Sequence, residues 1–183
     1  KELDMFQQRG LHFIHLNINS ILPKIDELRL IAVKTNAAVI GITESKIDES
    51  VLDGEIRIDG YIPVRNDRNR QGGGVVCYIR QDVPFNKIEI QCPNIEHIFL
   101  DIFLPKTKPI LIGILYRPPK QRGFLNTLST ALGNIPNLNS REIHILGDIN
   151  INLIYHGQKT PMGIKKYYEF CAMLGLIKII NNA

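Results

Sequence analysis

A strand–helix–strand pattern near the N-terminus limits the fold more than any other feature of the sequence. Two almost continuous apolar runs, residues 11–18 and 37–43, flank a segment with apolar side chains at helical spacing. Pro23 stands where a helix can open, and residues 24–34 keep their apolar side chains on one face. Such a unit joins two parallel strands, so we expect their carboxyl ends at the same edge of one sheet. The first apolar run predicts a central strand buried on both faces.

The middle of the chain changes to short strands joined by tight turns. Residues 47–69 are polar, which predicts loop with one short strand, and residues 66–74 are rich in turn formers. Four apolar runs follow, at residues 75–80, 87–91, 95–104 and 109–116. Their alternation and their short connections predict an antiparallel meander.

The last third of the chain repeats the signals of the first. Residues 124–132 predict a helix, residues 142–147 a buried strand, and residues 163–174 a final helix that Gly175 closes. Two βαβ-like halves with a meander between them imply two packed sheets with helices outside. We therefore expect residues 1–10 as a lead-in and residues 11–183 as one domain.

Bulk properties restrict the class of protein only mildly. A chain of 183 residues can bury a sizeable core, and its net charge of +4 permits a polyanionic partner without requiring one. Cys77, Cys92 and Cys171 are odd in number and form no CxxC pair, which predicts a reducing, intracellular compartment and no disulfides or zinc site. Cys77 and Cys171 are expected in the core. No apolar run approaches the ~18 residues of a membrane span, and Lys1–Gly10 lack the apolar core of a signal peptide.

Polar side chains stand where four predicted strands end. An Asp after a strand is commonly a turn residue or a helix N-cap, so Asp148 alone is ambiguous. Together, however, the strand ends supply two carboxylates, a phenol and several carboxamides, and this set is Asn17, Asn19, Glu44, Tyr116, Asp148 and Asn150. Hard oxygen ligands suit Mg²⁺ or Mn²⁺. The set therefore favours metal-assisted attack of water on phosphorus.

Five motifs in this order and spacing resemble one known family. They are LNINS (Leu16–Ser20), GITES (Gly41–Ser45), an arginine-containing turn before GGGV (Gly72–Val75), LYRPP (Leu115–Pro119) and LGDININ (Leu146–Asn152). The chain resembles the endonuclease/exonuclease/phosphatase superfamily over essentially its whole length, most of all the apurinic-type endonuclease domain of non-LTR (LINE-type) retrotransposons. The resemblance implies a deoxyribonuclease-like four-layer α/β sandwich, two mixed β-sheets flanked by helices. It also implies metal-dependent nicking of DNA, in the nucleus if genomic DNA is the substrate.

The same resemblance assigns roles to the strand-end residues. Glu44 matches the acidic metal ligand, and Asn17 matches the Asn that supports the site from the first strand. Asn19 falls where some relatives have Asp, as a further candidate ligand. Tyr116 matches the Tyr that contacts the scissile phosphate. Asp148 matches the Asp that activates or positions the attacking water.

Two residues beside these complete the implied phosphate site. Asn150 matches the Asn that holds the phosphate. Arg117 lies next to the phosphate position and would add positive charge there.

One departure from the family pattern stands out. Relatives continue into a strand with a further Asp and then a Ser-Asp-His motif, whereas this chain has no Asp after Asp148 and no Asp-His dipeptide. We therefore expect a domain incomplete at its C-terminus, with weak or lost activity. An uncovered sheet edge would then favour self-association.

Several features have two readings. Arg65, Arg68 and Arg70 either contact DNA phosphates or form a solvated hairpin tip. Gly72–Gly74 lack a following Gly-Lys-Ser/Thr, so they indicate a turn or bulge rather than a phosphate loop. Three histidines lie in apolar strands and are expected to be buried and hydrogen-bonded: His12, His15 and His144. His156 is the candidate substitute base.

Three functions remain open at this point. The first is a DNA-nicking endonuclease. The second is a phosphatase or phosphodiesterase of the same superfamily that acts on a small or lipid substrate. The third is a non-catalytic remnant that at most binds nucleic acid, which the missing Asp-His motif favours.

Overall fold

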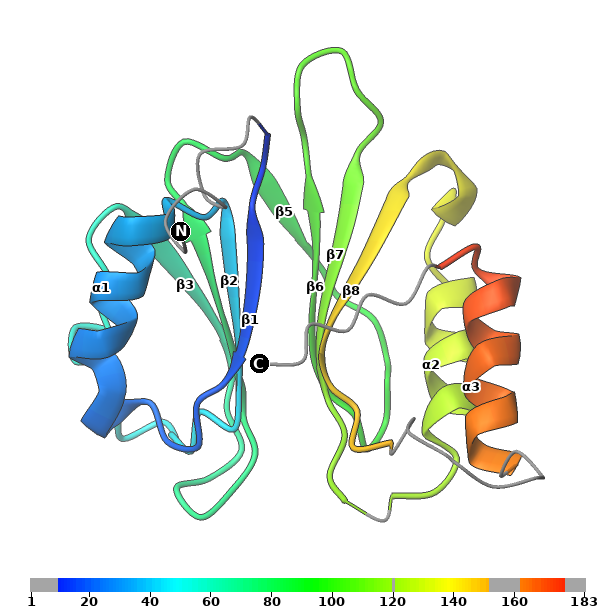
Figure 1. Cartoon of the computed structure of the whole chain (residues 1–183), viewed down its shortest axis with the longest axis horizontal. Coiled ribbons are helices and arrows are strands. Elements are labelled where there is room, and N and C mark those ends of the chain that lie inside the picture. The colour runs from blue at the N-terminus through cyan, green and yellow to red at the C-terminus, as the bar shows by residue number, and fades with distance from the viewer. Residues whose placement is uncertain (1–9, 120, 152–161, 177–183) are drawn as a thin grey trace, which may run out of the picture.

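Two four-stranded β-sheets packed face to face form the centre of the molecule, and helices cover their outer faces (Figure 1). The computed structural model describes residues 10–119, 121–151 and 162–176. The first sheet has the order β1-β2-β4-β3 and comprises β1 (Phe13–Asn17), β2 (Val39–Thr43), β3 (Tyr61–Asn66) and β4 (Val75–Arg80). The second has the order β5-β6-β7-β8 and comprises β5 (Phe85–Ile88), β6 (Glu96–Ile102), β7 (Ile110–Tyr116) and β8 (Glu142–Asp148).

The helices divide between the two outer faces. Helix α1 (Ile25–Thr35) covers the first sheet, and α2 (Phe124–Gly133) and α3 (Met162–Met173) cover the second (Figure 1). Short 3-10 turns, Leu22–Lys24 and Leu138–Ser140, precede α1 and β8. Pro23 lies in the first of these turns, immediately before α1, as its sequence position predicts.

Three layers of apolar side chains hold the four layers of backbone together. One cluster packs α1 on the first sheet, a second lies between the sheets, and a third packs the second sheet on α2 and α3. Strand β2 shows why the sequence folds this way: Ile40 and Ile42 face the α1 cluster, whereas Val39 faces the second sheet. Because alternate strand residues point to opposite faces, a strand between two layers must be apolar throughout. The predicted four-layer α/β sandwich with two mixed sheets is confirmed.

Two parallel strand pairs bring distant parts of the chain to one end of the sandwich. Strand β1 pairs with β2 so that Asn17 lies opposite Thr43, the residue before Glu44. Strand β7 pairs with β8 so that Tyr116 lies opposite Asp148. Both helix-linked units predicted from the sequence are confirmed, and each ends with polar side chains at its carboxyl edge.

The predicted meander is only partly correct. Strands β5, β6 and β7 are antiparallel neighbours, but β4 pairs with β2 and β3 in the first sheet. Strand β4 is apolar on both faces, with Val76 and Tyr78 toward α1 and Val75 and Cys77 toward the second sheet. The periodicity therefore located the strand correctly, but it carries no information about which sheet the strand joins.

The prediction that β1 is a central strand, and β8 a buried one, is wrong. Each is the edge strand of its sheet, and its residues are mostly half-buried. Both faces of β1 are covered, with Ile14 and Leu16 against α1 and Phe13 against the second sheet, which explains the apolar run. Its outer edge, like that of β8, pairs with no strand among the described residues. Self-association at these edges stays a prediction.

The histidines and cysteines complete the comparison with the sequence. His15 and His144 are half-buried rather than buried: His15 Nε2 lies 3.1 Å from Thr43 Oγ1, and His144 Nε2 lies 2.8 Å from Glu142 Oε1. Cys77, Cys92 and Cys171 are buried free thiols, so the two predicted core positions are confirmed. None of the described helices is long and apolar enough to cross a membrane.

Candidate active site

Asn17 joins the two carboxylates predicted to form the site. Its Nδ2 donates to Oε1 of Glu44 at 3.0 Å and to Oδ2 of Asp148 at 2.9 Å. The three residues belong to different elements, the ends of β1, β2 and β8, and Asp148 is 131 positions from Asn17 along the chain. A neutral amide has two N–H groups, so it can hold two negative side chains close together without adding charge. We call Asn17, Glu44, Tyr116, Asp148 and Asn150 the rim.

Glu44 is fixed by a tight turn that packs on the glycine loop. Glu44 and Lys46 have φ values of 54° and 51°, and the Ser45 and Lys46 amides donate to the Gly74 and Gly73 carbonyls at 3.3 and 3.0 Å. Gly74 itself has φ 86°, and a Cβ there would lie 2.4 Å from Ser45 Oγ. The glycines therefore form a closely packed turn, as predicted, and allow the backbone of the Glu44 turn to come near.

Lys46 is a site residue that the sequence reasoning missed. Its Nζ hydrogen-bonds Oδ1 of Asn19, the residue predicted as a further metal ligand, and lies 4.0 Å from Oε2 of Glu44. The structure thus brings Asn19 to the edge of the rim, with its side-chain oxygen on a cation. Its position two residues after Glu44 is the feature of the sequence that could have indicated it. Where the Lys46 side chain points, however, depends on the left-handed backbone of this turn.

Tyr116 is buried at the end of β7, opposite Asp148. Burial, followed by the nearby negative charge of Glu44 and a hydrogen bond with its side chain, raises the pKa of Tyr116 to about 12. The phenol is therefore protonated at neutral pH and can donate a hydrogen bond.

The turn after β8 orients Asp148 and Asn150. The Asn150 amide donates to Oδ1 of Asp148 at 3.0 Å, and the Asn150 side chain donates to the Arg117 carbonyl at 2.8 Å. Gly147 has φ 148°, and a Cβ there would lie 2.0 Å from the Leu115 carbonyl oxygen. Only glycine fits where β8 comes this close to β7, just before Asp148.

Arg117 holds the backbone beside the rim. Its guanidinium donates to the carbonyls of Gln121, Ile149 and Asn150, and its Cζ lies 5.8 Å from the centre of the Phe124 ring. These contacts connect the end of β7 with the turn after β8. The predicted contact of Arg117 with a phosphate stays a prediction.

The arginines of the glycine-loop region lie in different surroundings. Arg65 pairs with Asp53 and Asp67, both at 2.6 Å, which ties β3 to the preceding loop. Arg68 pairs with Glu96 at 3.0 Å, and Arg70 is exposed. Of the three, Arg68 comes nearest to the rim through Glu96, which lies opposite Tyr116. DNA contacts by Arg68 and Arg70 stay predictions.

Glu96 is a second residue that the sequence reasoning missed. It begins β6, lies opposite Tyr116 in the β6–β7 pair, and accepts hydrogen bonds from Arg68 and from the Gly74 amide. It thereby links the second sheet to the glycine loop of the first. No sequence motif marks this long-range contact.

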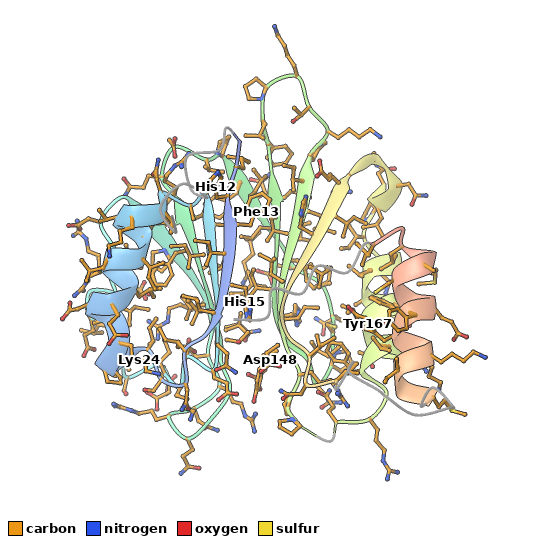
Figure 2. All side chains as sticks on the ribbon, viewed as in Figure 1. His12, Phe13, His15, Lys24, Asp148 and Tyr167 are labelled. Atoms are coloured by element: carbon orange, nitrogen blue, oxygen red, sulfur yellow. The ribbon has the colours of Figure 1, made fainter. Side chains whose placement is uncertain are left out.

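His15 and Asp148 both lie in the middle of the molecule, between the two sheets, in the view of Figure 2. Burial lowers its pKa, and the negative charge of Asp148 opposes this as the smaller effect. The neutral imidazole is therefore favoured in the folded protein. The candidate substitute base His156 lies outside the described residues.

The donor set of the rim fits a small hard cation. Its acidic groups are the carboxylates of Glu44 and Asp148, held together by Asn17. Mg²⁺ typically takes only one or two protein carboxylates and fills its other positions with water or phosphate oxygens. Within residues 10–119, 121–151 and 162–176, no cluster of three or more His, Cys, Asp or Glu side chains is arranged as a metal site, so a site here would use few protein ligands.

Comparisons with known proteins identify the fold. No family model matches the sequence, and no curated protein matches it. The endonuclease domain of TRAS1, a telomere-specific non-LTR retrotransposon, has a TM-score of 0.64 and 14% identity, over 91% of this chain and 71% of its own. AP endonuclease LMAP from Leishmania major has a TM-score of 0.69 and 12% identity, over 88% of this chain and 65% of its own.

A further structure has a bound nucleic acid. The 3′ phosphatase NExo from Neisseria, bound to a product DNA hairpin, has a TM-score of 0.61 and 14% identity, over 90% of this chain and 71% of its own. All three are longer than the part that this chain matches. The chain therefore has the two-sheet α/β fold of endonuclease/exonuclease/phosphatase-type enzymes, as its motifs imply.

Proposed function

We propose that this chain hydrolyses phosphodiester bonds in DNA with the help of Mg²⁺ or Mn²⁺, as a nicking endonuclease. The observation that carries the proposal is the Asn17 bridge, which brings Glu44 and Asp148 together beside the protonated Tyr116. Two carboxylates held so close favour a cation between or beside them. Glu44 would be the main ligand for that ion, which would supply positive charge to stabilise the developing charge on the phosphate.

The rim residues have distinct tasks in this reaction. Asp148 accepts a proton from the attacking water as the water oxygen bonds to phosphorus, and the Asn150 amide on its Oδ1 at 3.0 Å keeps the carboxylate in one orientation. The bond from phosphorus to the leaving sugar oxygen breaks, and that oxygen takes a proton from solvent. Tyr116 has a single phenolic hydrogen, which it would turn from the Glu44 carboxylate to a phosphate oxygen when the substrate binds. The second side-chain N–H of Asn150 is available for another phosphate oxygen, since the first is held by the Arg117 carbonyl at 2.8 Å.

The retrotransposon origin of the activity is part of the proposal. It rests on the likeness of the five motifs and on the presence of a retrotransposon endonuclease domain among the similar structures. An element of this kind acts on genomic DNA, so we propose a nuclear location. A 3′ phosphatase is also among the similar structures, which keeps a phosphatase activity as the enzymatic alternative.

A non-catalytic protein that binds nucleic acid is the alternative from another class. The net charge of +4 permits a polyanionic partner without any cleavage. Cleavage and binding are therefore measured separately.

A supercoiled-plasmid nicking assay with Mg²⁺, and with EDTA as a blank, tests the proposal. Nicking should require the metal and should fall at least about 100-fold in Glu44→Gln and in Asp148→Asn. Glu142→Gln is the matched control, because it removes an exposed carboxylate from the same strand, β8, away from the rim. DNA binding with no nicking by the wild type would sink the endonuclease proposal and favour the non-catalytic function. Faster release of inorganic phosphate from a 3′-phosphorylated oligonucleotide would favour the phosphatase.

A further inference from the structure

A cavity of about 440 Å³ adjoins the rim on the side of α2 and α3. It is bounded by the chain that follows β7, the first turn of α2, the residues after β8 and the beginning of α3. Asn150 belongs to both the rim and the cavity wall. The cavity is therefore continuous with the proposed catalytic end of the sandwich.

The charges around this cavity are all positive. Arg117, Arg122 and Lys166 line it, and none of the described residues in its wall is acidic. Arg117 already makes four hydrogen bonds with backbone carbonyls. Arg122 and Lys166, in contrast, are exposed and form no ion pair with another residue of the described part of the chain, whereas neighbouring Lys165 lies 3.9 Å from Glu169. Two cations that form no ion pair with a described residue thus face one concave surface, which attracts anions.

The rest of the wall suits a nucleotide better than a simple ion. Phe124, Leu125 and Ile151 supply apolar surface, and Asn126 and Asn150 supply amides. A volume of about 440 Å³ lies in the range of small-molecule sites, roughly 300–1,000 Å³. Apolar surface for a sugar or base, with cations at the mouth for a phosphate, is the pattern expected for a strand of nucleic acid.

We propose that this cavity binds a nucleotide of the DNA strand next to the scissile position, with its phosphate on Arg122 and Lys166. The inference rests on the proposed function, because it assumes that the scissile phosphate lies at the rim. A strand that passes Asn150 enters the cavity directly. The two cations then position the strand and set its direction across the rim, without taking part in the chemistry.

Fluorescence anisotropy with a labelled 20-mer, as single strand and as duplex, tests this site without cleavage when EDTA is present. Affinity falls as salt rises, and the double variant Arg122→Gln/Lys166→Gln should make the slope of log affinity against log salt less negative by about one for each cation removed. The matched control is Lys106→Gln/Lys108→Gln, which removes the same charge from exposed positions at the opposite end of β7. The control should keep the wild-type slope within about half a unit. Equal slopes in the two double variants, or no DNA binding by the wild type, would overturn the proposal.

The same proteins separate this proposal from the catalytic one. Asp148→Asn should bind DNA with the wild-type slope and lose nicking. Binding that depends on Arg122 and Lys166 in a wild type that does not nick would refute the endonuclease and leave the strand-binding cavity intact. If the wild type nicks DNA but the Arg122→Gln/Lys166→Gln variant binds DNA with the wild-type slope, only the proposal that the cavity binds a nucleotide is refuted. Equal thermal midpoints of the two double variants would exclude a folding effect as the cause.

Discussion

The two βαβ units of this protein have the same topology but hold their acidic residues in different ways. In the first unit, Glu44 follows β2, which lies between β1 and β4 and is buried at every position. In the second, Asp148 ends β8, an edge strand whose residues are half-exposed. A strand with two neighbours is fixed from both sides, whereas an edge strand depends on one neighbour and on local contacts.

This difference matters for the chemistry proposed here. A ligand for a cation benefits from a rigid position, and Glu44 has one, because its turn also packs on Gly73 and Gly74. A group that accepts a proton from water must be reachable, and Asp148 is partly exposed, with its orientation set by the Asn150 amide. The same supersecondary unit thus provides a fixed and an accessible carboxylate.

Glycine substitutions give the largest expected contrast between the two units. Gly147→Ala should destabilise the fold by about 3 kcal/mol, because its Cβ would lie 2.0 Å from backbone at Leu115 in a φ of 148°. Gly74→Ala should cost about 1–2 kcal/mol, because the nearest atom is the Ser45 hydroxyl, which can rotate away. Urea unfolding monitored by circular dichroism measures both. If both variants lose the same free energy of unfolding, rotation of the Ser45 hydroxyl does not relieve the contact at Gly74, and the expected contrast is wrong.

An intermediate effect is expected for the residue that anchors β8. Arg141 precedes β8, and its guanidinium makes two hydrogen bonds of 2.7 Å with the buried carboxylate of Asp101 on β6. Arg141→Ala leaves Asp101 without its partner and should cost about 2 kcal/mol. Arg57→Ala is the control, because its pair with Asp59 at 3.0 Å is well exposed and should contribute at most about 1 kcal/mol. If the two variants unfold at the same urea concentration, the anchoring role assigned to Arg141 is wrong.

The smallest expected effect concerns His15, which extends from the first unit toward Asp148 of the second. Burial lowers the pKa of His15 below its ordinary value of 6.5, so the unfolded chain takes up a proton at a higher pH than the folded chain does. The contribution of neutral His15 to the free energy of unfolding is therefore fully present above about pH 7, and it is lost as the pH falls below 6.5. The variant His15→Gln should lose less stability between pH 7 and pH 5 than the wild type, as measured by urea unfolding at each pH. A steeper loss in the variant would contradict the assignment.

Much of this fold could be predicted from the sequence because its strongest signals are local. The run at residues 37–43 is apolar on both faces, and β2 is indeed buried throughout. The position of β1 at the edge of its sheet could not be predicted. The pattern of apolar residues indicates which faces of a strand are covered, but it does not indicate whether other strands pair with both of its edges. For the same reason β4 was placed in the meander, although its partners are β2 and β3.

The candidate site shows the same limit. Asn17, Glu44, Tyr116 and Asp148 could be predicted to meet, because parallel strands end at one edge. The contacts of Lys46 with Asn19 and of Glu96 with Gly74 could not, because each depends on backbone with positive φ and on residues 22 or more positions apart. Contacts of that kind arise only when the chain is packed, and they produce no periodic pattern in the sequence.

The link made by Glu96 has a consequence for motion. The two sheets meet through apolar side chains, and such an interface permits small sliding of one layer over the other. Glu96 ties Gly74 and Arg68 of the first sheet to the start of β6, beside Tyr116. Asn17 adds a second polar link between the sheets where it donates to Asp148, and Asn66 adds a third where it donates to the His97 carbonyl. Directional hydrogen bonds resist sliding more than apolar contacts do, so the links made by Glu96 and Asn17 hold the two sheets in register beside the rim.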